Sequence, residues 1–351
     1  TPSSAASDVY KRQTPVPTTP TPVPPTSTPT PPAGGWAPSH GMWQTAAELA
    51  DNPTSGAAWD NLLAKADLSG DVDISNQNST HDTRTFAAAM VATRLQDQGL
   101  RAAVADAILS AVGTEDGGRT LALGRNLVGY VVAADLINLA DLDPTADAEF
   151  RAWLTGVRLE ELSGRTLVST HEDRPNNWGT HAGASRIAAS IYLGDTADVA
   201  AAGVVYAGYV GDRDAYAEFR YGSLSWQSDP ANPVGINPVG ATIDGHNADG
   251  VVPDDQRRGG SFTWPPPCEN YVREGLQGLV VQAELLSAWA TESDAVGRAA
   301  IWFTDVAGCE FSGDDEWLAP LIDTRTSANL DYPQGVNHGK NLGFTDWTHG
   351  S

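Results

Sequence analysis

The sequence predicts an all-α globular domain, because apolar residues recur at intervals of three and four along most of it and strand-like alternation is scarce. The segments with this spacing are rich in Ala, Leu and Val, and short turns of Gly, Asp and Pro separate them. Successive helices joined by short turns are expected to pack as antiparallel hairpins. The predicted helices cover residues 83–95, 100–112, 121–139, 146–162, 185–193, 272–290 and 294–306.

The composition narrows the classes of partner. Of the 351 residues, 41% are hydrophobic and 19% are charged, which is enough apolar material for a sizeable core. The net charge of −23 argues against nucleic acid, because phosphate binding needs basic surface. An anionic polysaccharide is compatible with this charge, since a few cationic residues focused in a cleft can bind one. No apolar run reaches the ~20 residues of a membrane span, so we expect no membrane partner.

A Thr/Pro-rich segment precedes the globular part. Residues 14–32 are almost entirely Thr and Pro, a composition that forms an extended, semi-rigid spacer. Such spacers often join a catalytic domain to a carbohydrate-binding module in secreted bacterial enzymes, so we expect a secreted protein with a module before the linker; a disordered tail is the alternative. The chain begins at Thr1 without Met or signal peptide, and we expect its natural start upstream. We divide it into a tail and linker, 1–35, and a globular domain, 36–351.

One long stretch breaks the helical pattern. Residues 220–268 contain many Gly, Asp, Pro and Trp. A long irregular segment inside a compact helical domain is usually functional, and we expect loops that cross the mouth of the site. Cys268 and Cys309 are the only two cysteines, and the sequence leaves open whether they form a disulfide or stay as buried thiols.

The most informative segment, 174–183, combines two amides, an indole and an imidazole next to an Ala-rich helix. Asn176, Asn177 and Trp178 precede His181 there. The free N–H groups and partial positive charge of a helix start suit a carboxylate. The same dipole favours a neutral His181 that can accept a proton. The alternative is a capping turn with a buried, hydrogen-bonded histidine.

A second candidate segment lies at 243–278. Adjacent Arg257 and Arg258 in a loop suit bidentate binding of a carboxylate. Tyr271 follows a Pro-rich turn at the start of a helix, so we expect its phenol to project into a cleft. The alternative is a surface arginine pair and a packing tyrosine.

Two further polar clusters are candidates for lining the cleft. Residues 67–82 include His81 and precede a helix, and Asp71 and Asp73 give them a weak likeness to a calcium loop. Their spacing does not match an EF-hand, so we prefer helix capping and keep a structural calcium as the alternative. Arg125 lies inside an apolar helix, where it points inward or pairs with an acid. Candidates for stacking on sugar rings are Trp178, Trp226, Trp264 and Trp347, of which about half are expected to be ordinary core.

Three motifs carry a resemblance to a known family. NNWGTH at 176–181, ENY at 269–271 and GKNLGFTDWTHG at 339–350 resemble the alginate-lyase superfamily. Its members are toroidal polysaccharide lyases that act on alginate or on β-1,4-glucuronan. The likeness covers about residues 40 to 350. It implies an (α/α) toroid or barrel of six to seven helical hairpins, with long irregular loops over the cleft, and we expect a monomer.

The resemblance also implies which residues surround the cleavage point. Asn177, His181 and Tyr271 match the family's catalytic Asn, His and Tyr, and Arg258, or less favourably Arg257, matches its Arg. Related lyases often have the histidine directly after the asparagine pair, whereas here Trp178 takes that place. A spacing of four still puts Asn177 and His181 on one face if the turn is helical. The predicted substrate-binding residues are Asn176, Trp178, Arg257, His246, Asn270, Trp264, Arg125, His81 and Lys340.

The implied reaction is β-elimination on a uronate, with alginate as the first substrate and β-1,4-glucuronan as the second. A base removes the C5 proton, an acid protonates O4, and hydrogen-bond donors neutralise the carboxylate. Tyr271 is the expected acid, His181 or Tyr271 the base, and no cofactor is needed. One alternative is an (α/α)-barrel glycoside hydrolase that uses paired carboxylates, and another is a non-catalytic glycan-binding module. The candidate carboxylates are Asp254, Asp255, Glu269 and Glu274.

Overall fold

The computed structural model describes residues 35–289, 294–333, 335 and 339–350, so the predicted linker at 14–32 lies outside the described residues. Within these ranges the chain is mostly helical, which confirms the all-α class. The strands there are a two-residue pair, β1 (Thr242–Ile243) and β2 (His246–Asn247). No helix in the described part is long and apolar enough to cross a membrane.

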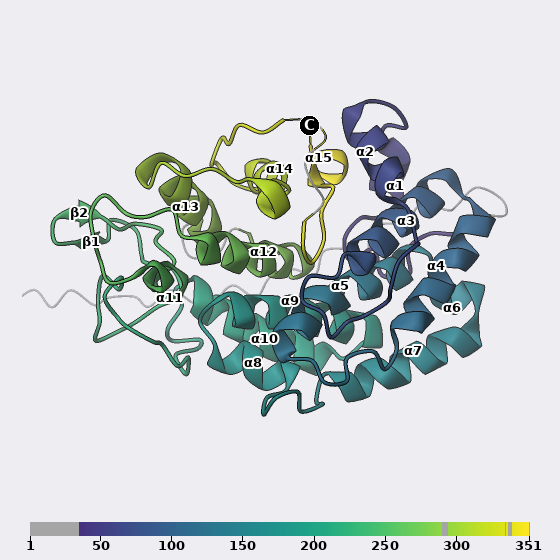
Figure 1. The fold of residues 1–351 in the computed structure, drawn as a ribbon, viewed down its shortest axis with the longest axis horizontal. Helices are drawn as coiled ribbons and strands as arrows, with labels where there is room; N and C mark the ends of the chain where they lie inside the picture. Colours follow the sequence, from purple (N-terminus) through teal and green to yellow (C-terminus); the bar gives the residue numbers. More distant parts are fainter. Residues whose placement is uncertain (1–34, 290–293, 334, 336–338, 351) are drawn as a thin grey trace, which may run out of the picture. The chain divides into compact units, whose positions relative to one another are not determined.

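Figure 1 labels the helices and strands and colours the chain from the N-terminus to the C-terminus. The irregular helical turns are the 3-10 turns η1 (Arg257–Gly259) and η3 (Gly313–Asp315) and the π-helical turn η2 (Trp302–Val306). The α-helices are α1 (Ala46–Asp51), α2 (Ala57–Lys65), α3 (His81–Leu95), α4 (Gln98–Ala111), α5 (Thr120–Leu136), α6 (Leu139–Leu142), α7 (Pro144–Val157), α8 (Leu167–Asp173), α9 (Asn177–Leu193), α10 (Thr196–Val210), α11 (Pro253–Gln256), α12 (Asn270–Leu285), α13 (Ala295–Ile301), α14 (Leu318–Arg325) and α15 (Thr345–Thr348).

Local sequence explains where the main helices begin and end. Asp97, Asp143 and Asp195 each accept a hydrogen bond from the first turn of α4, α7 and α10, as expected of N-cap residues. α9 begins at Asn177, eight residues before the predicted 185, and ends at Gly194, whose φ of 72° suits a glycine cap. α10 was not among the predicted helices, although its Ala and Val content is high.

Three of the longest helices run in the same direction side by side. Ser185 of α9 donates to the carbonyl of Gly124 and accepts from the amide of Val128 in α5. A side chain at Gly278 of α12 would meet the backbone of Thr180 and His181 in α9, so the glycine permits this close approach. Residue numbers therefore increase in the same direction along α5, α9 and α12. The N-terminal ends of the three helices lie together. Polar residues from three distant segments meet there.

The irregular stretch and the cysteine pair also agree with the sequence. Residues 220–268 hold only short elements, namely β1, β2, α11 and η1. Cys268 and Cys309 form a disulfide with Cα atoms 5.6 Å apart. It ties the turn before α12 to the loop after η2, and closing a loop of this separation, 41 residues, contributes about 4 kcal/mol in the chain-entropy account.

Glu284 of α12 binds Arg325 and His349 of the C-terminal segment. We expect its ionisation to control the stability of the fold in acid. Burial opposes ionisation, but hydrogen bonds from His349 and Arg325 prevail and lower the pKa of Glu284 to about 2. The ordinary value is higher, so this group stabilises the fold above about pH 4.5, and the contribution disappears as the pH falls toward 2. The shift corresponds to about 3 kcal/mol. In urea titrations at pH 6 and pH 3, Glu284→Gln should lose about 3 kcal/mol of stability at pH 6 and less than half of that at pH 3; an equal loss at both would contradict this account.

Candidate functional site

The candidate site lies where the N-terminal ends of α5, α9 and α12 meet. Tyr271 is the second residue of α12, and Asn177 is the first residue of α9. Glu274 follows Tyr271 by one helical turn, so the two share a face of α12. Arg125, in the second turn of α5, reaches the same place. The parallel packing thus brings the carboxylate of Glu274, the guanidinium of Arg125 and the amide of Asn177 together from three separate helices.

A buried ion pair forms the floor of this site. Arg125 and Glu274 are 4% and 9% exposed, and their side chains form a salt bridge. Glu274 also lies 3.6 Å from the ammonium of Lys340, which in turn lies 3.3 Å from Asp314. Burial lowers the pKa of Arg125 to about 10, while Asp315, Asp314 and Tyr271 act in the opposite direction. The Tyr271 phenol is therefore within electrostatic range of the buried pair.

His181 is fully buried beside this pair. Its Nε2 accepts a hydrogen bond from Nε of Arg125 at 3.3 Å and lies 3.8 Å from the Glu274 carboxylate. Burial, and then Arg125, hold the pKa of His181 well below its usual range, with an opposing interaction from Asn341. The imidazole is thus neutral, as the sequence predicts, although burial and not the helix dipole is the main cause.

Two acidic residues hold the asparagine pair in place. Asn176 caps α9 by accepting from the amide of Trp178, and its own amide donates to Asp254 at 2.8 Å. The backbone amide of Asn177 donates to Asp255 at 3.1 Å. Burial raises the pKa of Asp255 well above its usual range. The side-chain oxygen of Asn177 is buried and unpartnered among the described residues.

The two candidate arginines differ in availability. Arg257 forms a bidentate pair with Asp254, with distances of 2.6 and 3.1 Å. Arg258 is exposed, and its guanidinium carbon lies 3.9 Å from the centre of the Tyr271 ring. Tyr271 itself is 36% exposed. Of the two, Arg258 is the one that forms no ion pair among the described residues, and its role at the cleavage point stays a prediction.

The structure distributes the other predicted binding residues differently. His246 and Trp264 stack on each other with ring centres 4.5 Å apart, within the irregular stretch. Asn270 accepts from Arg273. His81 is buried against the hydroxyl of Tyr130, at 2.9 Å. These side chains already have protein partners, whereas Lys340 and Trp178 lie next to the central cluster.

Two tryptophans proposed for sugar stacking belong to the core. Trp226 is 1% exposed and Trp347 is 2% exposed. Their indole N–H groups donate to the carbonyls of Gly260 and Pro53. Buried tryptophans need such a partner, and this accounts for both positions without a ligand.

The polar turn at 67–82 uses its acids to stabilise itself. Asp67 accepts from the amide and hydroxyl of Ser69, and Asp73 does the same for Ser75. These contacts close local turns and do not cap α3, whose N-cap residue Thr80 makes no side-chain cap hydrogen bond, so the predicted helix capping is wrong for these acids. Within the described residues no group of three or more His, Cys, Asp or Glu is arranged to hold a metal ion.

Sequence reasoning did not assign roles to several residues of the cluster. Glu274 was considered only as a hydrolase carboxylate, and Asn341 and Asp315 were not singled out. Glu274 had a detectable signal, since it lies three residues after Tyr271 on a predicted helix. Asn341 lies in the motif at 339–350, but its contact depends on how the C-terminal segment folds back onto α5, where its side chain lies 3.5 Å from the carbonyl of Gly124.

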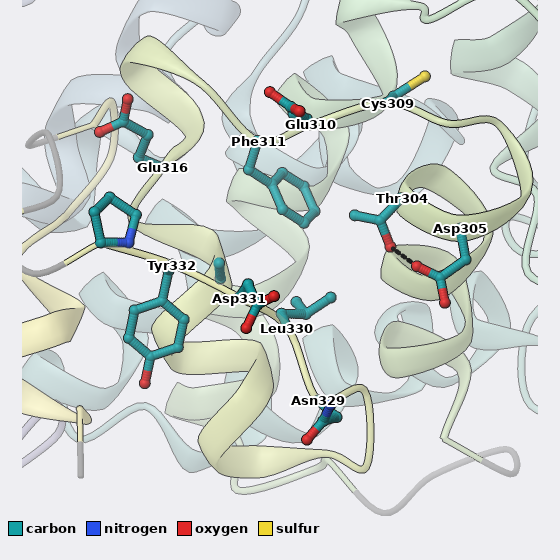
Figure 2. Close-up of a pocket in the computed structure, with 12 residues that line it drawn as sticks. Thr304, Asp305, Cys309, Glu310, Phe311, Glu316, Asn329, Leu330, Asp331 and Tyr332 are labelled. Carbon is teal, nitrogen blue, oxygen red and sulfur yellow. Dashed lines mark hydrogen bonds between the residues drawn. The ribbon is translucent and has the colours of Figure 1, made fainter.

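A separate cavity of about 390 Å³ lies between η2, the loop after it and residues 329–333. Figure 2 shows its side chains, among which the hydroxyl of Thr304 donates to Asp305 at 2.9 Å. Its charged lining residues are Asp305, Glu310, Glu316 and Asp331. Four carboxylates without a basic residue in the lining would repel an anionic polymer, so charge favours the Tyr271 cluster as the place for one.

We take this cluster as the candidate active site. Its parts are the exposed phenol and guanidinium of Tyr271 and Arg258, the buried Arg125–Glu274 pair, the partly buried Lys340 and the buried His181. Comparisons of the chain with protein-family models, with curated proteins and with solved structures give no match in any of the three.

Proposed function

We propose that the chain is a secreted polysaccharide lyase that cleaves a uronate-containing glycan by β-elimination. The observation that carries the proposal is the exposed Tyr271 phenol under the guanidinium of Arg258, one helical turn from the buried Arg125–Glu274 ion pair. An anionic sugar placed there meets a proton donor and a carboxylate-binding group at once. Alginate is the first substrate to test and β-1,4-glucuronan the second.

The proposed reaction needs three groups within reach of one sugar ring. The C5–H bond breaks as a base takes the proton, its electron pair forms the C4–C5 double bond, and the C4–O4 bond breaks. When the C5 proton and O4 lie on one face of the sugar, the phenolate of Tyr271 takes the C5 proton and passes the same proton to the departing O4. When they lie on opposite faces, a separate base takes the C5 proton and the phenol of Tyr271 protonates O4. Arg258 binds the carboxylate and stabilises the charge that develops on it during proton removal.

The buried residues have a supporting place in this proposal. His181 and Asn177 have almost no exposed surface, so in this conformation they act through their neighbours. His181 accepts from Arg125, and Arg125 pairs with Glu274 one turn from Tyr271. These contacts position the end of α12 that carries the phenol. Direct proton transfer by His181 stays a prediction.

The wider features of the proposal have their own support. We propose an (α/α) toroid because α5, α9 and α12 run in parallel, as inner helices of such a ring would. The Cys268–Cys309 disulfide supports an oxidising, extracellular location, as does the composition of residues 14–32.

Arg258→Ala is expected to raise KM for anionic oligomers and to lower kcat/KM by about tenfold to a hundredfold, because a charge-assisted hydrogen bond contributes about 1.5–3 kcal/mol. Arg257→Ala is the matched comparison, since Arg257 is already paired with Asp254. It should alter stability more than substrate affinity. An unchanged kcat/KM for Arg258→Ala, with a loss in Arg257→Ala, would exchange the two roles.

A spectrophotometric assay tests the function directly. The purified chain is incubated with alginate, with glucuronan and with a neutral glucan, and ultraviolet absorbance of the C4–C5 double bond is followed. A rise with a uronate polymer only supports the lyase. New reducing ends without absorbance would indicate a glycoside hydrolase, and binding with unchanged polymer length would indicate a binding module; either result contradicts the proposal.

A further inference from the structure

Three arginines differ from the others in the described part of the chain. Arg119, Arg174 and Arg258 form no ion pair and no side-chain hydrogen bond there, and each lies over an aromatic ring instead. The remaining described arginines bind carboxylates or main-chain carbonyls through their side chains. In a chain with a net charge of −23, arginines whose side chains bind neither a carboxylate nor a carbonyl in the described residues are unusual. All three lie beside residues of the candidate site.

Two of these arginines share one indole. The guanidinium carbons of Arg119 and Arg174 lie 5.9 and 5.7 Å from the centre of the Trp178 ring. Arg119 is the N-cap of α5, Arg174 follows the end of α8, and Trp178 lies in the first turn of α9. The parallel course of α5 and α9 brings Arg119 to Trp178, next to Asn177. The indole is partly exposed and available to a sugar ring.

The carboxylates nearest to Arg174 already have other partners. Asp173 pairs with Arg165 at 2.9 Å and with Arg220 at 3.4 Å. Asp254 pairs with Arg257. Burial lowers the pKa of Arg174, and the charges of Arg165 and Arg257 lower it further. The carboxylates of Asp173 and Asp254 raise it. Basic groups therefore exceed carboxylates around Arg174.

Arg119 also borders a polar cavity. The cavity has a volume of about 380 Å³, and its lining includes the amides of Asn76, Gln77 and Asn78. None of its eight lining residues is acidic. Amides bind sugar hydroxyls as both donors and acceptors, and a guanidinium binds a carboxylate with two parallel hydrogen bonds. Ala122 of the lining is one helical turn from Arg125, so the cavity adjoins the candidate site.

We propose that Arg119, Arg174 and Trp178 form a second carboxylate-binding subsite, which holds a uronate residue next to the one that is cleaved. The indole stacks on the sugar ring, the two guanidinium groups bind its carboxylate, and the neighbouring amides bind hydroxyls. This inference rests on the proposed function and extends it: the enzyme recognises a run of uronates and not a single acidic sugar.

The test measures binding apart from turnover. Tyr271→Phe in the full-length chain is the parent, since it keeps the ring under Arg258, and the probes are a tetramannuronate and the same oligomer with its carboxyl groups reduced to alcohols. Calorimetry should give a Kd for tetramannuronate about tenfold weaker in Arg119→Ala and in Arg174→Ala, close to 1.4 kcal/mol for each. Affinity for the reduced oligomer should be the same in all variants. Arg94→Ala, which removes a cation that binds only the carbonyl of Asn52, should leave both values unchanged.

The outcomes separate the subsite from the lyase activity. An unchanged Kd for tetramannuronate in both variants overturns the subsite, even if the wild type produces the ultraviolet-absorbing product. A weaker Kd in both supports the subsite, even if no such product forms. Failure of the parent to bind tetramannuronate, or equal losses for the reduced oligomer, also overturns it. Thermal unfolding midpoints equal to the parent's confirm that the exposed Arg119 was removed without a change of fold.

Discussion

Tyr271→Phe is expected to lower kcat on a uronate polymer by about a thousandfold or more while Kd for the polymer changes little. Phe keeps the ring that lies 3.9 Å from the Arg258 guanidinium and removes only the hydroxyl. General acid catalysis contributes about 10²–10⁴-fold, and the loss is larger if the same phenol is also the base. Initial rates of the ultraviolet-absorbing product and calorimetric Kd values provide the two measurements.

A matched tyrosine controls for nonspecific effects of the change. Tyr332 lines the acidic cavity, and Tyr332→Phe should leave kcat unchanged. Residual activity of Tyr271→Phe above roughly a tenth of the parent would remove Tyr271 from the acid role, because losing a general acid costs at least about a hundredfold. A raised Kd with unchanged kcat would instead assign the phenol to substrate binding.

Glu274→Gln is expected to lower the free energy of unfolding by about 3–5 kcal/mol, since it leaves Arg125 buried without its counter-ion. Arg125 is 4% exposed, and water cannot replace the lost carboxylate. Lys340 loses the same partner. The variant should also lower kcat, because the Arg125–Glu274 pair positions the turn of α12 that carries Tyr271. Urea unfolding followed by circular dichroism measures the first effect.

Two variants make this prediction specific. Glu269→Gln changes the other acid near the start of α12, which caps the helix through the amide of Tyr271, and should cost less than about 1 kcal/mol. Combining Arg125→Met with Glu274→Gln removes both charges and should recover part of the stability. If Glu274→Gln alone were as stable as the parent, the pair would not form the floor of the site.

Much of the site was accessible from the sequence because its residues lie at helix starts. Asn177 and His181 are four apart, and that spacing places them on one helical face once α9 is known to begin at Asn177. Tyr271 follows a Pro-rich turn, and such turns mark the boundary before a helix. Local backbone preferences determine these features, so neighbouring residues suffice to predict them.

Other features depended on partners far away in the chain. The choice between Arg257 and Arg258 required the position of Asp254, which occupies Arg257. The same applies to the tryptophans: Trp178 is partly exposed, whereas Trp226 and Trp347 are enclosed by the core. A residue's type and spacing do not reveal whether another segment covers it.

The sequence by itself determined the all-α class, most of the long helices and the irregular stretch at 220–268. These follow from periodicity and composition, which act over a few neighbouring residues. Only the tertiary structure decided the Cys268–Cys309 pairing, the burial of His181, the Arg125–Glu274 pair and the meeting of Arg119 with Trp178. Each depends on which helices lie side by side, and here small glycines let α5, α9 and α12 approach closely enough to bring those side chains together.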